Sequence, residues 1–295
     1  YRFIQDKNHS NFAFQWKLFS KTQLDSYNKS FESEKRLLYQ SKMKPEDFMN
    51  KTILEIGSGA GRFTEILKKY KSTVYTVDYT AAIEVNYENN SDNNIKFFQA
   101  DIFNLPFKKN SFDIVLCYGV IQHTGDNLKA IEALSDLPKK NNGILLLDIY
   151  SNSLRHYNPW IYFIRIFFKI LNTTDQKKFS YVKYIVNLLF PFYLKLLTLI
   201  KPYDNILLIK YFKYFINRSP ISVYGINLFL NKKISLEVAK EWSLLDTYDA
   251  WTPKFDKPVS LNKWNKIINF IKLKYKFKKA EIGESGQGYI AKLIN

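Results

Sequence analysis

Two kinds of hydrophobic pattern divide the chain. Between residues 51 and 150, short apolar runs rich in Ile, Val, Leu and aromatic residues alternate with stretches of helical periodicity. Within these runs polar and apolar positions barely alternate, as is typical of parallel strands that are buried on both faces. The pattern predicts a parallel sheet covered by helices. We expect strands at Thr52–Ile56, Thr73–Val77, Ile95–Ala100, Phe112–Tyr118 and Gly143–Tyr150.

The apolar pattern changes after residue 150. Residues 151–233 hold long aromatic and aliphatic runs interrupted by four prolines, which predicts an all-helical insertion. The apolar stretches 160–171 and 181–200 suggest membrane-spanning helices, but a span needs about 20 mostly apolar residues, and lysine or arginine interrupts both stretches. A lysine or arginine at the centre of a span costs about 2.5–3.5 kcal/mol. We therefore expect these helices to form a lid, line a pocket or lie on a membrane surface rather than cross a membrane.

The strand pattern returns at the C-terminal end. Residues 261–273 have helical periodicity, and two strand-like runs follow at 275–282 and 288–294, joined by the turn Gly283-Glu-Ser-Gly286. Turn chemistry of this kind predicts a hairpin. The expected organisation is a helical cap at 1–50, an α/β core at 51–150, a basic, aromatic-rich helical insertion at 151–255, and a completion of the core at 256–295.

Composition narrows the classes of protein. A chain of 295 residues buries about three quarters of its unfolded surface, so it needs no disulfide or metal to hold a core. The single cysteine, Cys117, makes no internal disulfide and predicts a reducing compartment. The three histidines lack ligand spacing, so we expect no metal site. No secretory signal is visible near residue 1. These observations predict a cytoplasmic protein.

The chain is strongly basic, with 44 Lys and Arg against 27 Asp and Glu, a net charge of +17. Residues 151–233 contain 13 Lys and Arg but two acids, so +11 of this charge lies in one block. Such a block fits nucleic acid or an acidic membrane surface, or a basic surface without a specific partner. Its basic residues are interleaved with apolar ones rather than clustered, which disfavours nucleic acid.

One motif carries the sharpest chemical signal. The segment Ile53-Leu-Glu-Ile-Gly57-Ser-Gly59-Ala-Gly61-Arg62 is a predicted strand that ends in three alternate glycines before a helix. Glycines allow a tight turn and a close approach of ligand to backbone. A nicotinamide site would place the third glycine one position later and a small residue at Arg62. The acid inside the motif, Glu55, suits a ligand with an ammonium group better than one with phosphates.

From this motif onward the core resembles class I S-adenosylmethionine (SAM)-dependent methyltransferases. The resemblance implies a Rossmann-like α/β fold: a seven-stranded methyltransferase sheet with a C-terminal antiparallel hairpin and, here, an all-helical insertion. It assigns the methionine part of SAM to the glycine loop, the ribose to an acid after the second strand, adenine to a pair after the third, and the methyl-donor region to the end of the fourth. The implied cofactor residues are Glu55, Gly57, Ser58, Gly59, Gly61, Arg62, Asp78, Tyr79, Asp101, Ile102 and Tyr118.

Segments outside the core resemble flanking parts of one bacterial subgroup of these enzymes, at 12–16, 22–27 and 245–256. That resemblance implies a small-molecule or glycan-like acceptor, methylated on oxygen. His123 is the expected general base, because its side chain belongs to the suitable pKa class. Asp249 is a second catalytic candidate, in competition with Asp246 and Asp256. Trp16, Tyr248 and Trp251 are candidates for the pocket wall.

Two other functions stay open from the sequence. One is an RNA methyltransferase that uses the basic block on phosphates, whose affinity would fall steeply with salt. The other is a catalytically silent SAM-fold protein that binds membranes or partners through 151–233. The same block predicts peripheral contact with the inner face of a membrane for the enzyme as well.

Overall fold

The computed structural model describes residues 1–2, 10–153 and 158–295, and it divides the chain into two compact units. An α/β unit comprises Tyr1–Ser20, Phe31–His156 and Lys254–Asn295, and a helical unit comprises Lys21–Ser30 and Tyr157–Pro253. The helical unit differs from the predicted insertion, 151–255, in two ways: it includes ten residues of the expected N-terminal cap, and its second segment is shorter, Tyr157–Pro253. Residues 154–157, at the expected start of the insertion, lie outside the described residues.

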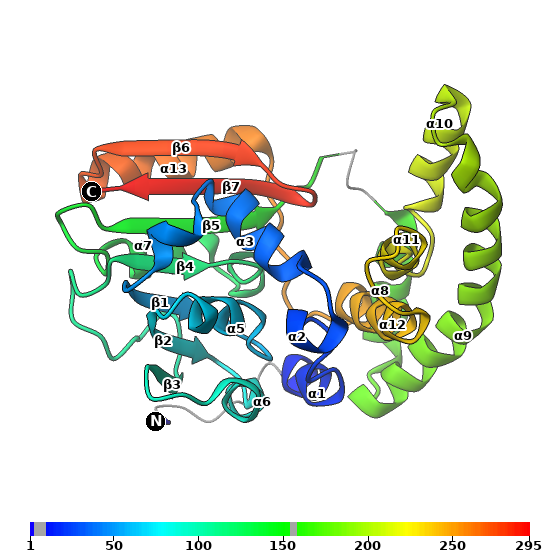
Figure 1. Ribbon diagram of the computed structural model, residues 1–295, viewed down its shortest axis with the longest axis horizontal. Helices are drawn as coiled ribbons and strands as arrows, with labels where there is room; N and C mark the ends of the chain where they lie inside the picture. The colour runs from blue at the N-terminus through cyan, green and yellow to red at the C-terminus, as the bar shows by residue number, and fades with distance from the viewer. Residues whose placement is uncertain (3–9, 154–157) are drawn as a thin grey trace. The chain divides into compact units, whose positions relative to one another are not determined.

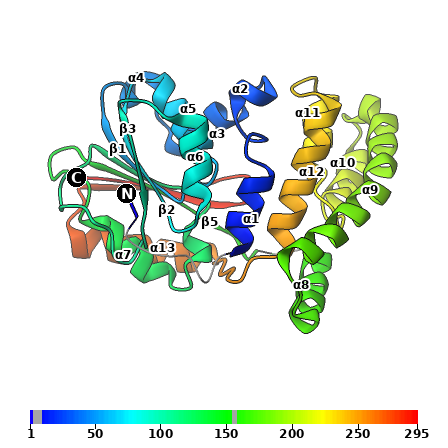
Figure 2. The same ribbon diagram turned by 90° about the horizontal axis from the view of Figure 1, so that it is seen from below.

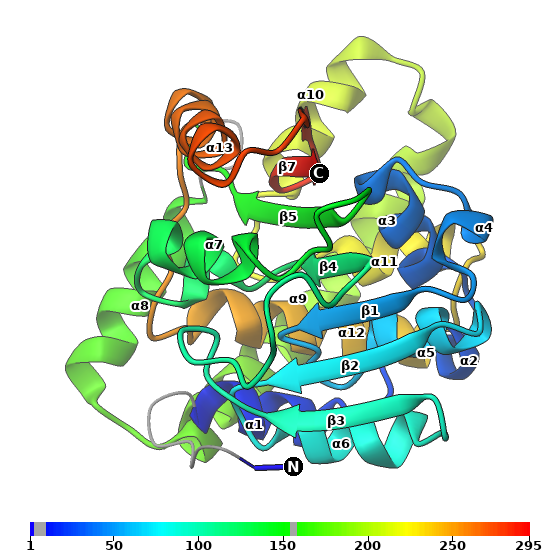
Figure 3. The same ribbon diagram turned by 90° about the vertical axis from the view of Figure 1, so that its left-hand side faces the viewer.

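A seven-stranded sheet forms the centre of the α/β unit, in the order β3-β2-β1-β4-β5-β7-β6 (Figures 1 and 3). The first five strands pair in parallel, whereas β7 pairs antiparallel with both β5 and β6. The expected methyltransferase-type sheet with a terminal hairpin is therefore confirmed. The strands are β1 Thr52–Ile56, β2 Thr73–Asp78, β3 Ile95–Gln99, β4 Ile114–Cys117, β5 Ile144–Tyr150, β6 Lys279–Glu284 and β7 Gly288–Ile294.

Helices cover both faces of this sheet, as Figure 2 shows. On one face lie α3 Glu32–Ser41, α4 Pro45–Phe48, α5 Arg62–Lys69 and α6 Ala82–Asn90, and on the other lie α7 Asn127–Ser135 and α13 Leu261–Tyr275. Each face has its own apolar core, because the central strands are buried on both sides. The N-terminal helix α1 Ser10–Leu18 packs against α6, and a short 3₁₀ helix, η1 Ile121–His123, follows β4.

The helical unit packs around α12 Leu236–Trp251, which contacts α8 Pro159–Leu171, α9 Asp175–Ile200 and α11 Tyr224–Leu230. The unit also contains α2 Asp25–Asn28, the 3₁₀ helix η3 Lys201–Tyr203 and α10 Leu207–Ile216. Side chains cap several helices: the Thr174 hydroxyl accepts a hydrogen bond from the Lys177 N–H at the start of α9, and Ser235 does the same for Val238 at α12. The described residues of this segment are helical apart from the connecting turns, as predicted.

Candidate functional site

The loop between β1 and α5 has a backbone that only glycine adopts without strain. Gly57, Gly59 and Gly61 have φ values of +71°, +54° and +91°. Their surroundings are also tight, since a Cβ would lie 2.1 Å from the Val120 side chain at Gly57 and 2.7 Å from the Trp16 ring at Gly59. The loop is therefore a close-packed cradle in which side chains on alternate residues would not fit.

Hydrogen bonds join this loop directly to the end of β2. The N–H groups of Gly57 and Ser58 donate to the carbonyl of Val77 at 2.7 and 3.1 Å, and the Gly59 N–H donates to Asp78 Oδ2 at 2.8 Å. The predicted loop and the predicted ribose carboxylate thus lie side by side, at the carboxyl ends of adjacent parallel strands. In open α/β sheets this edge is where ligands bind.

Asp78 already serves several donors. Besides the Gly59 bond, its Oδ1 accepts hydrogen bonds from the N–H and the hydroxyl of Thr80, both at 2.8 Å, and the residue is 7% exposed. A carboxylate offers about four acceptor sites. With at least three sites in use, binding both hydroxyls of a ribose requires one or more of these bonds to be exchanged.

Glu55 is buried beneath the loop. Its Oε2 accepts hydrogen bonds from the hydroxyls of Thr64 at 2.5 Å and Thr76 at 3.2 Å, and Asn86 donates to both threonines. Burial raises the pKa of this carboxyl to about 7. These contacts make Glu55 a brace between β1, β2 and the helices that follow them. The interpretation of Glu55 as the direct partner of an ammonium group gains no support from them.

The other predicted cofactor residues lie at neighbouring strand ends. Asp101 follows β3 and accepts a hydrogen bond from the Phe103 N–H at 2.9 Å, as a turn residue does, and Ile102 beside it is buried. The Tyr79 carbonyl accepts a bond from Gln99. Tyr118 is buried after β4, where its ring meets that of Phe63 at 5.9 Å. Its hydroxyl has no hydrogen-bond partner among the described residues.

Arg62 and Trp16 contact the loop region from different elements. The Arg62 guanidinium lies 5.1 Å from the centre of the Phe63 ring and donates to the Ser33 hydroxyl at 3.3 Å. Trp16, half-buried in α1, lies against Gly59. The structure therefore brings this one pocket-wall candidate to the glycine loop.

His123 has a defined tautomer. Its Nδ1 lies 2.8 Å from the carbonyl oxygen of Phe255, and since a carbonyl only accepts, Nδ1 carries the proton. In the neutral ring, Nε2 then keeps a lone pair. The ring is 9% exposed and lies between those of Phe12 and Tyr150, at centroid distances of 5.2 and 5.8 Å. These contacts fix the orientation of the ring, and its role as the general base stays a prediction.

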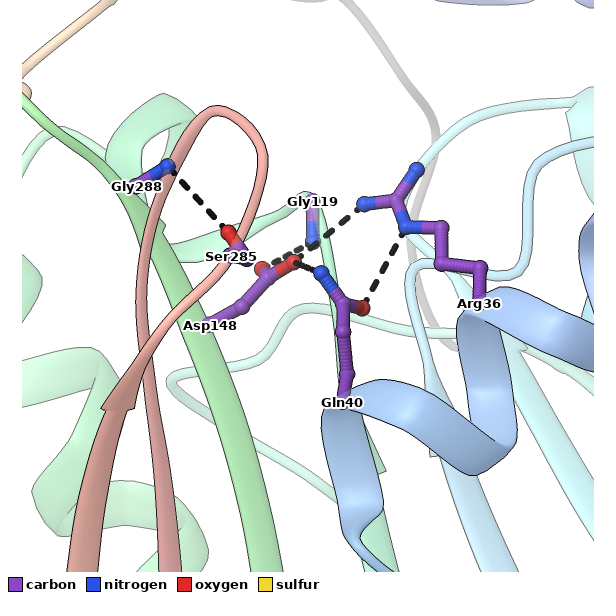
Figure 4. A network of polar contacts seen from close by, with 6 residues as sticks. All are labelled: Arg36, Gln40, Gly119, Asp148, Ser285 and Gly288. Atoms are coloured by element: carbon purple, nitrogen blue, oxygen red, sulfur yellow. Dashed lines mark hydrogen bonds and ion pairs between the residues drawn. The ribbon is translucent and has the colours of Figure 1, made fainter.

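A buried ionic network, missed by the sequence analysis, lies beside the end of β4 (Figure 4). Asp148 of β5 accepts hydrogen bonds from the Gly119 N–H at 2.5 Å, Arg36 Nη2 at 3.2 Å and Gln40 Nε2 at 3.4 Å. Burial raises the pKa of the Asp148 carboxyl, and the Arg36 guanidinium acts against this rise. The sequence did contain a signal for this network. Asp148 interrupts a continuous apolar run, and a buried charge requires a partner.

The remaining candidates belong to α12 in the helical unit. Tyr248 and Trp251 are buried there, and their rings pack against Phe179 and Phe168 at 6.0 Å each. The Trp251 indole also donates to the Pro220 carbonyl at 3.1 Å. Packing within the unit accounts for both aromatic residues, and their assignment to a substrate wall stays a prediction. Asp249 is half-buried in the same helix.

Two further features bear on the nature of the site. Among the residues that the structure describes, no group of three or more His, Cys, Asp or Glu side chains is arranged to hold a metal ion. A surface hollow of about 570 Å³ lies between α3 and the β6–β7 hairpin, lined by residues that include Tyr39, Lys42 and Glu284. It contains none of the predicted site residues.

Comparison with known proteins places the glycine loop in a known domain family. Residues 54–147 match the family model described as "Methyltransferase domain". The chain is 31% identical over 103 residues to the uncharacterized methyltransferase YcgJ of Bacillus subtilis (strain 168), covering 34% of this chain and 41% of that protein. It is 34% identical over 114 residues to phosphoethanolamine N-methyltransferase 1 of Triticum aestivum, covering 35% and 21%. The chain thus spans less than half the length of these curated relatives.

Solved structures resemble the chain more distantly. PKMT2 from Rickettsia typhi, in complex with AdoHcy, has a TM-score of 0.45 and 18% identity over 81% of this chain and 42% of its own. The YcgJ protein from Bacillus subtilis has a TM-score of 0.36 and 24% identity over 45% and 58%. With TM-scores below 0.5, these likenesses carry no argument about activity.

Proposed function

Residues 54–147 form a class I SAM-dependent methyltransferase domain, and from this premise we propose that the chain transfers the methyl group of SAM to an oxygen of a small-molecule or glycan-like acceptor. The observation that carries the cofactor half is the 2.8 Å bond from the Gly59 N–H to Asp78. It joins the two parts that a sulfonium nucleoside needs, a loop with glycine at alternate positions and a carboxylate for the sugar.

The residues present fit this cofactor. Glycine at three alternate positions leaves the loop without a Cβ at those positions, and the buried Ser58 hydroxyl has no hydrogen-bond partner among the described residues. Gly57, Ser58, Gly59 and Gly61 would hold the methionine part, Asp78 with Tyr79 the ribose, and the side chains after β3 the adenine. When bound, SAM supplies an electrophilic methyl group on a sulfonium.

The protein's own part of the reaction is to orient the acceptor, exclude water and remove a proton. We assign proton removal to His123 Nε2, because the Phe255 carbonyl keeps the proton of the ring on Nδ1. The acceptor hydroxyl would lose its proton to Nε2 as the new C–O bond forms. Base assistance of this kind contributes about 100- to 10,000-fold. Asp249 stays a second candidate for the catalytic role.

Calorimetric titration of the full chain with SAM tests the cofactor half. Asp78→Ala should weaken binding by at least about tenfold, because it removes both the ribose acceptor and the anchor of the Gly59 N–H. The matched control is Asp92→Ala, an exposed aspartate in the turn before β3 that accepts one local bond. No heat of SAM binding, or equal affinity for all three proteins, would refute the assignment.

Methyl transfer from radiolabelled SAM to panels of phenols, sugar alcohols, oligosaccharides and amines tests the acceptor half. With a panel member that is methylated, His123→Ala should lower turnover by about 100-fold or more while SAM affinity is kept. Added imidazole should restore part of the rate. Unchanged turnover would remove His123 as the base, and methylation confined to nitrogen acceptors would overturn the oxygen assignment.

A further inference from the structure

Helix α9 is apolar on two opposite sides. Its buried row packs inside the helical unit, and a second apolar row is exposed. The buried residues are Val182, Val186, Phe190 and Leu197, and the exposed ones are Tyr181, Tyr184, Leu188, Phe192 and Leu199. With 3.6 residues per turn, the two rows lie on roughly opposite sides of the helix. Intramolecular packing therefore explains only one of them.

Helix α8 repeats this feature. Among its 13 residues only Phe168 is buried, whereas Phe163 and Ile170 are 69% and 76% exposed. The exposed Phe167 ring lies 6.5 Å from that of Tyr181, so the outward apolar surfaces of α8 and α9 meet. A joined apolar surface on two helices is more than the scattered exposure that is normal for a soluble protein.

Helix α10 is exposed along almost its whole length. Ile216 is its only buried residue, and its outward side chains are mainly apolar, as in Leu207, Leu208, Tyr211 and Phe215. A ten-residue helix gains little stability from local propensity alone. The exposed apolar side chains of α10 therefore indicate that an apolar environment outside the helical unit covers this helix.

The charge on these helices has one sign. Residues 159–218 contain ten Lys and Arg and two acids, and each acid is paired with a lysine, Asp175 with Lys178 and Asp204 with Lys213. The side chains of Lys169, Lys177, Lys183, Lys195 and Lys210 are exposed. Lys177 and Lys195 fall on the same side of α9 as its exposed apolar row. Long lysine side chains let the charge reach a polar layer while their stems cover apolar surface.

We propose that α8, α9 and α10 form a surface that docks on an anionic lipid membrane and lies along it. The exposed apolar side chains match the acyl boundary of such a membrane, and the interleaved lysines match its acidic headgroups. Nucleic acid would match the charge but leave the apolar rows exposed, and an uncharged membrane or a second copy would leave the charge unmatched.

The surface lies along the membrane rather than across it. The helix Asp175–Tyr203 is long and apolar enough to span a bilayer, the one helix of this kind within the described ranges. Its inner row, however, is already packed in the helical unit, and Lys183 and Lys195 lie within the span. Crossing would bring both lysines into the acyl region and remove α9 from its packing on α12.

Sedimentation of the full chain with vesicles tests the proposal. We expect partition onto phosphatidylcholine vesicles containing phosphatidylglycerol to exceed that onto pure phosphatidylcholine by about tenfold or more at low salt. The difference should shrink as salt screens the lysines. Equal binding to both vesicle types, or no binding to either, would overturn the proposal.

Variants locate the surface. Ile170→Glu and Leu188→Glu place a negative charge on exposed apolar positions and should each lower partition by about tenfold, as should the double variant Lys183→Gln/Lys195→Gln. The matched control is Leu273→Glu on α13 of the α/β unit, where the leucine is 77% exposed. Because all five substituted positions are exposed, thermal unfolding followed by circular dichroism should match that of the wild type for every variant. Equal losses for the control and the test variants would overturn the assignment to α8–α10.

Two further outcomes would replace the lipid surface by another explanation. Protein that stays with vesicles after alkaline carbonate would indicate a spanning helix. If light scattering without vesicles shows a dimer, and Leu188→Glu dissociates it, the surface would instead bind a second copy of the chain. The proposed membrane docking does not depend on methyl transfer. Calorimetry with SAM on the same variants tests the two proposals separately, because SAM affinity should be unchanged in all of these variants.

Discussion

Glu55 shows at the scale of a single residue how the glycine loop is supported. Its carboxyl is buried, its bonds come from two threonine hydroxyls, and burial raises its pKa from 4.5 to about 7. The folded protein therefore holds this proton to a higher pH than the unfolded chain does. It follows that the free energy of unfolding falls as pH rises from about 4.5 to 7, and that this contribution stays absent above pH 7.

Glu55→Gln tests this linkage. The amide cannot ionise, so the variant should lack that part of the pH dependence, and its stability relative to wild type should improve by about 3 kcal/mol between pH 4.5 and pH 8. Urea denaturation across this range measures the difference. The control is Glu88→Gln on the exposed side of α6, whose profile should follow wild type. Parallel profiles for Glu55→Gln and wild type would show that the buried carboxyl does not titrate in this range.

At the scale of elements, the Asp148 network joins α3, β4 and β5 at the edge of the site. Asp148 receives the Gly119 N–H at the end of β4 and the side chains of Arg36 and Gln40 from α3. Gly119 has a positive φ of +75°, and its N–H bond to Asp148 holds the start of the turn that leads toward His123. The network therefore positions the segment that carries the predicted base.

Asp148→Ala should lower the free energy of unfolding by about 3 kcal/mol, because three donors lose their buried acceptor. The double variant Arg36→Met/Asp148→Leu should recover part of this loss, since neither charge is then left alone. Denaturant unfolding measures both. The control is Asp136→Ala, which breaks the exposed pair with Lys109 and should change stability little. A loss for Asp148→Ala no larger than for the control would contradict a structural role for the network.

At the scale of the whole molecule, each of the two units has its own buried core, and the predicted cofactor residues belong to the α/β unit alone. A ligand that binds only the folded state stabilises the unit that holds it by mass action. Binding of SAM should therefore leave a local signature in the full chain.

Hydrogen exchange with and without SAM measures this signature. With SAM at 100 times its dissociation constant, stabilisation of about 2.7 kcal/mol should slow exchange of the amides in 53–64 and 73–80 by up to about 100-fold. Amides of α9 serve as the internal control and should change far less. Equal protection in both units, or protection confined to α9, would place the cofactor elsewhere.

Much of the fold was predictable from local pattern. Parallel strands buried on both faces are apolar at nearly every position, so β1 was located from Thr52 to Ile56 and β2 to β5 to within two residues. The strand expected at 275–282 was placed wrongly at its start, since β6 begins at Lys279 and helix α13 continues to Tyr275. The three glycines were predictable as a cradle because their spacing after a strand demands an unusual backbone. The hairpin of β6 and β7 was marked by its glycine-rich turn.

The sequence by itself thus determined the strand pattern, the glycine loop, the acid that ends β2 and the basic apolar helices, because each is encoded over a few neighbouring residues. Only the tertiary structure decided which distant groups meet. Arg36 and Asp148 are 112 residues apart, and His123 and the carbonyl that orients it are 132 apart. It also decided that Tyr248 and Trp251 are core residues while one side of α9 faces outward. Periodicity marks an apolar side of a helix, but packing alone determines what covers it.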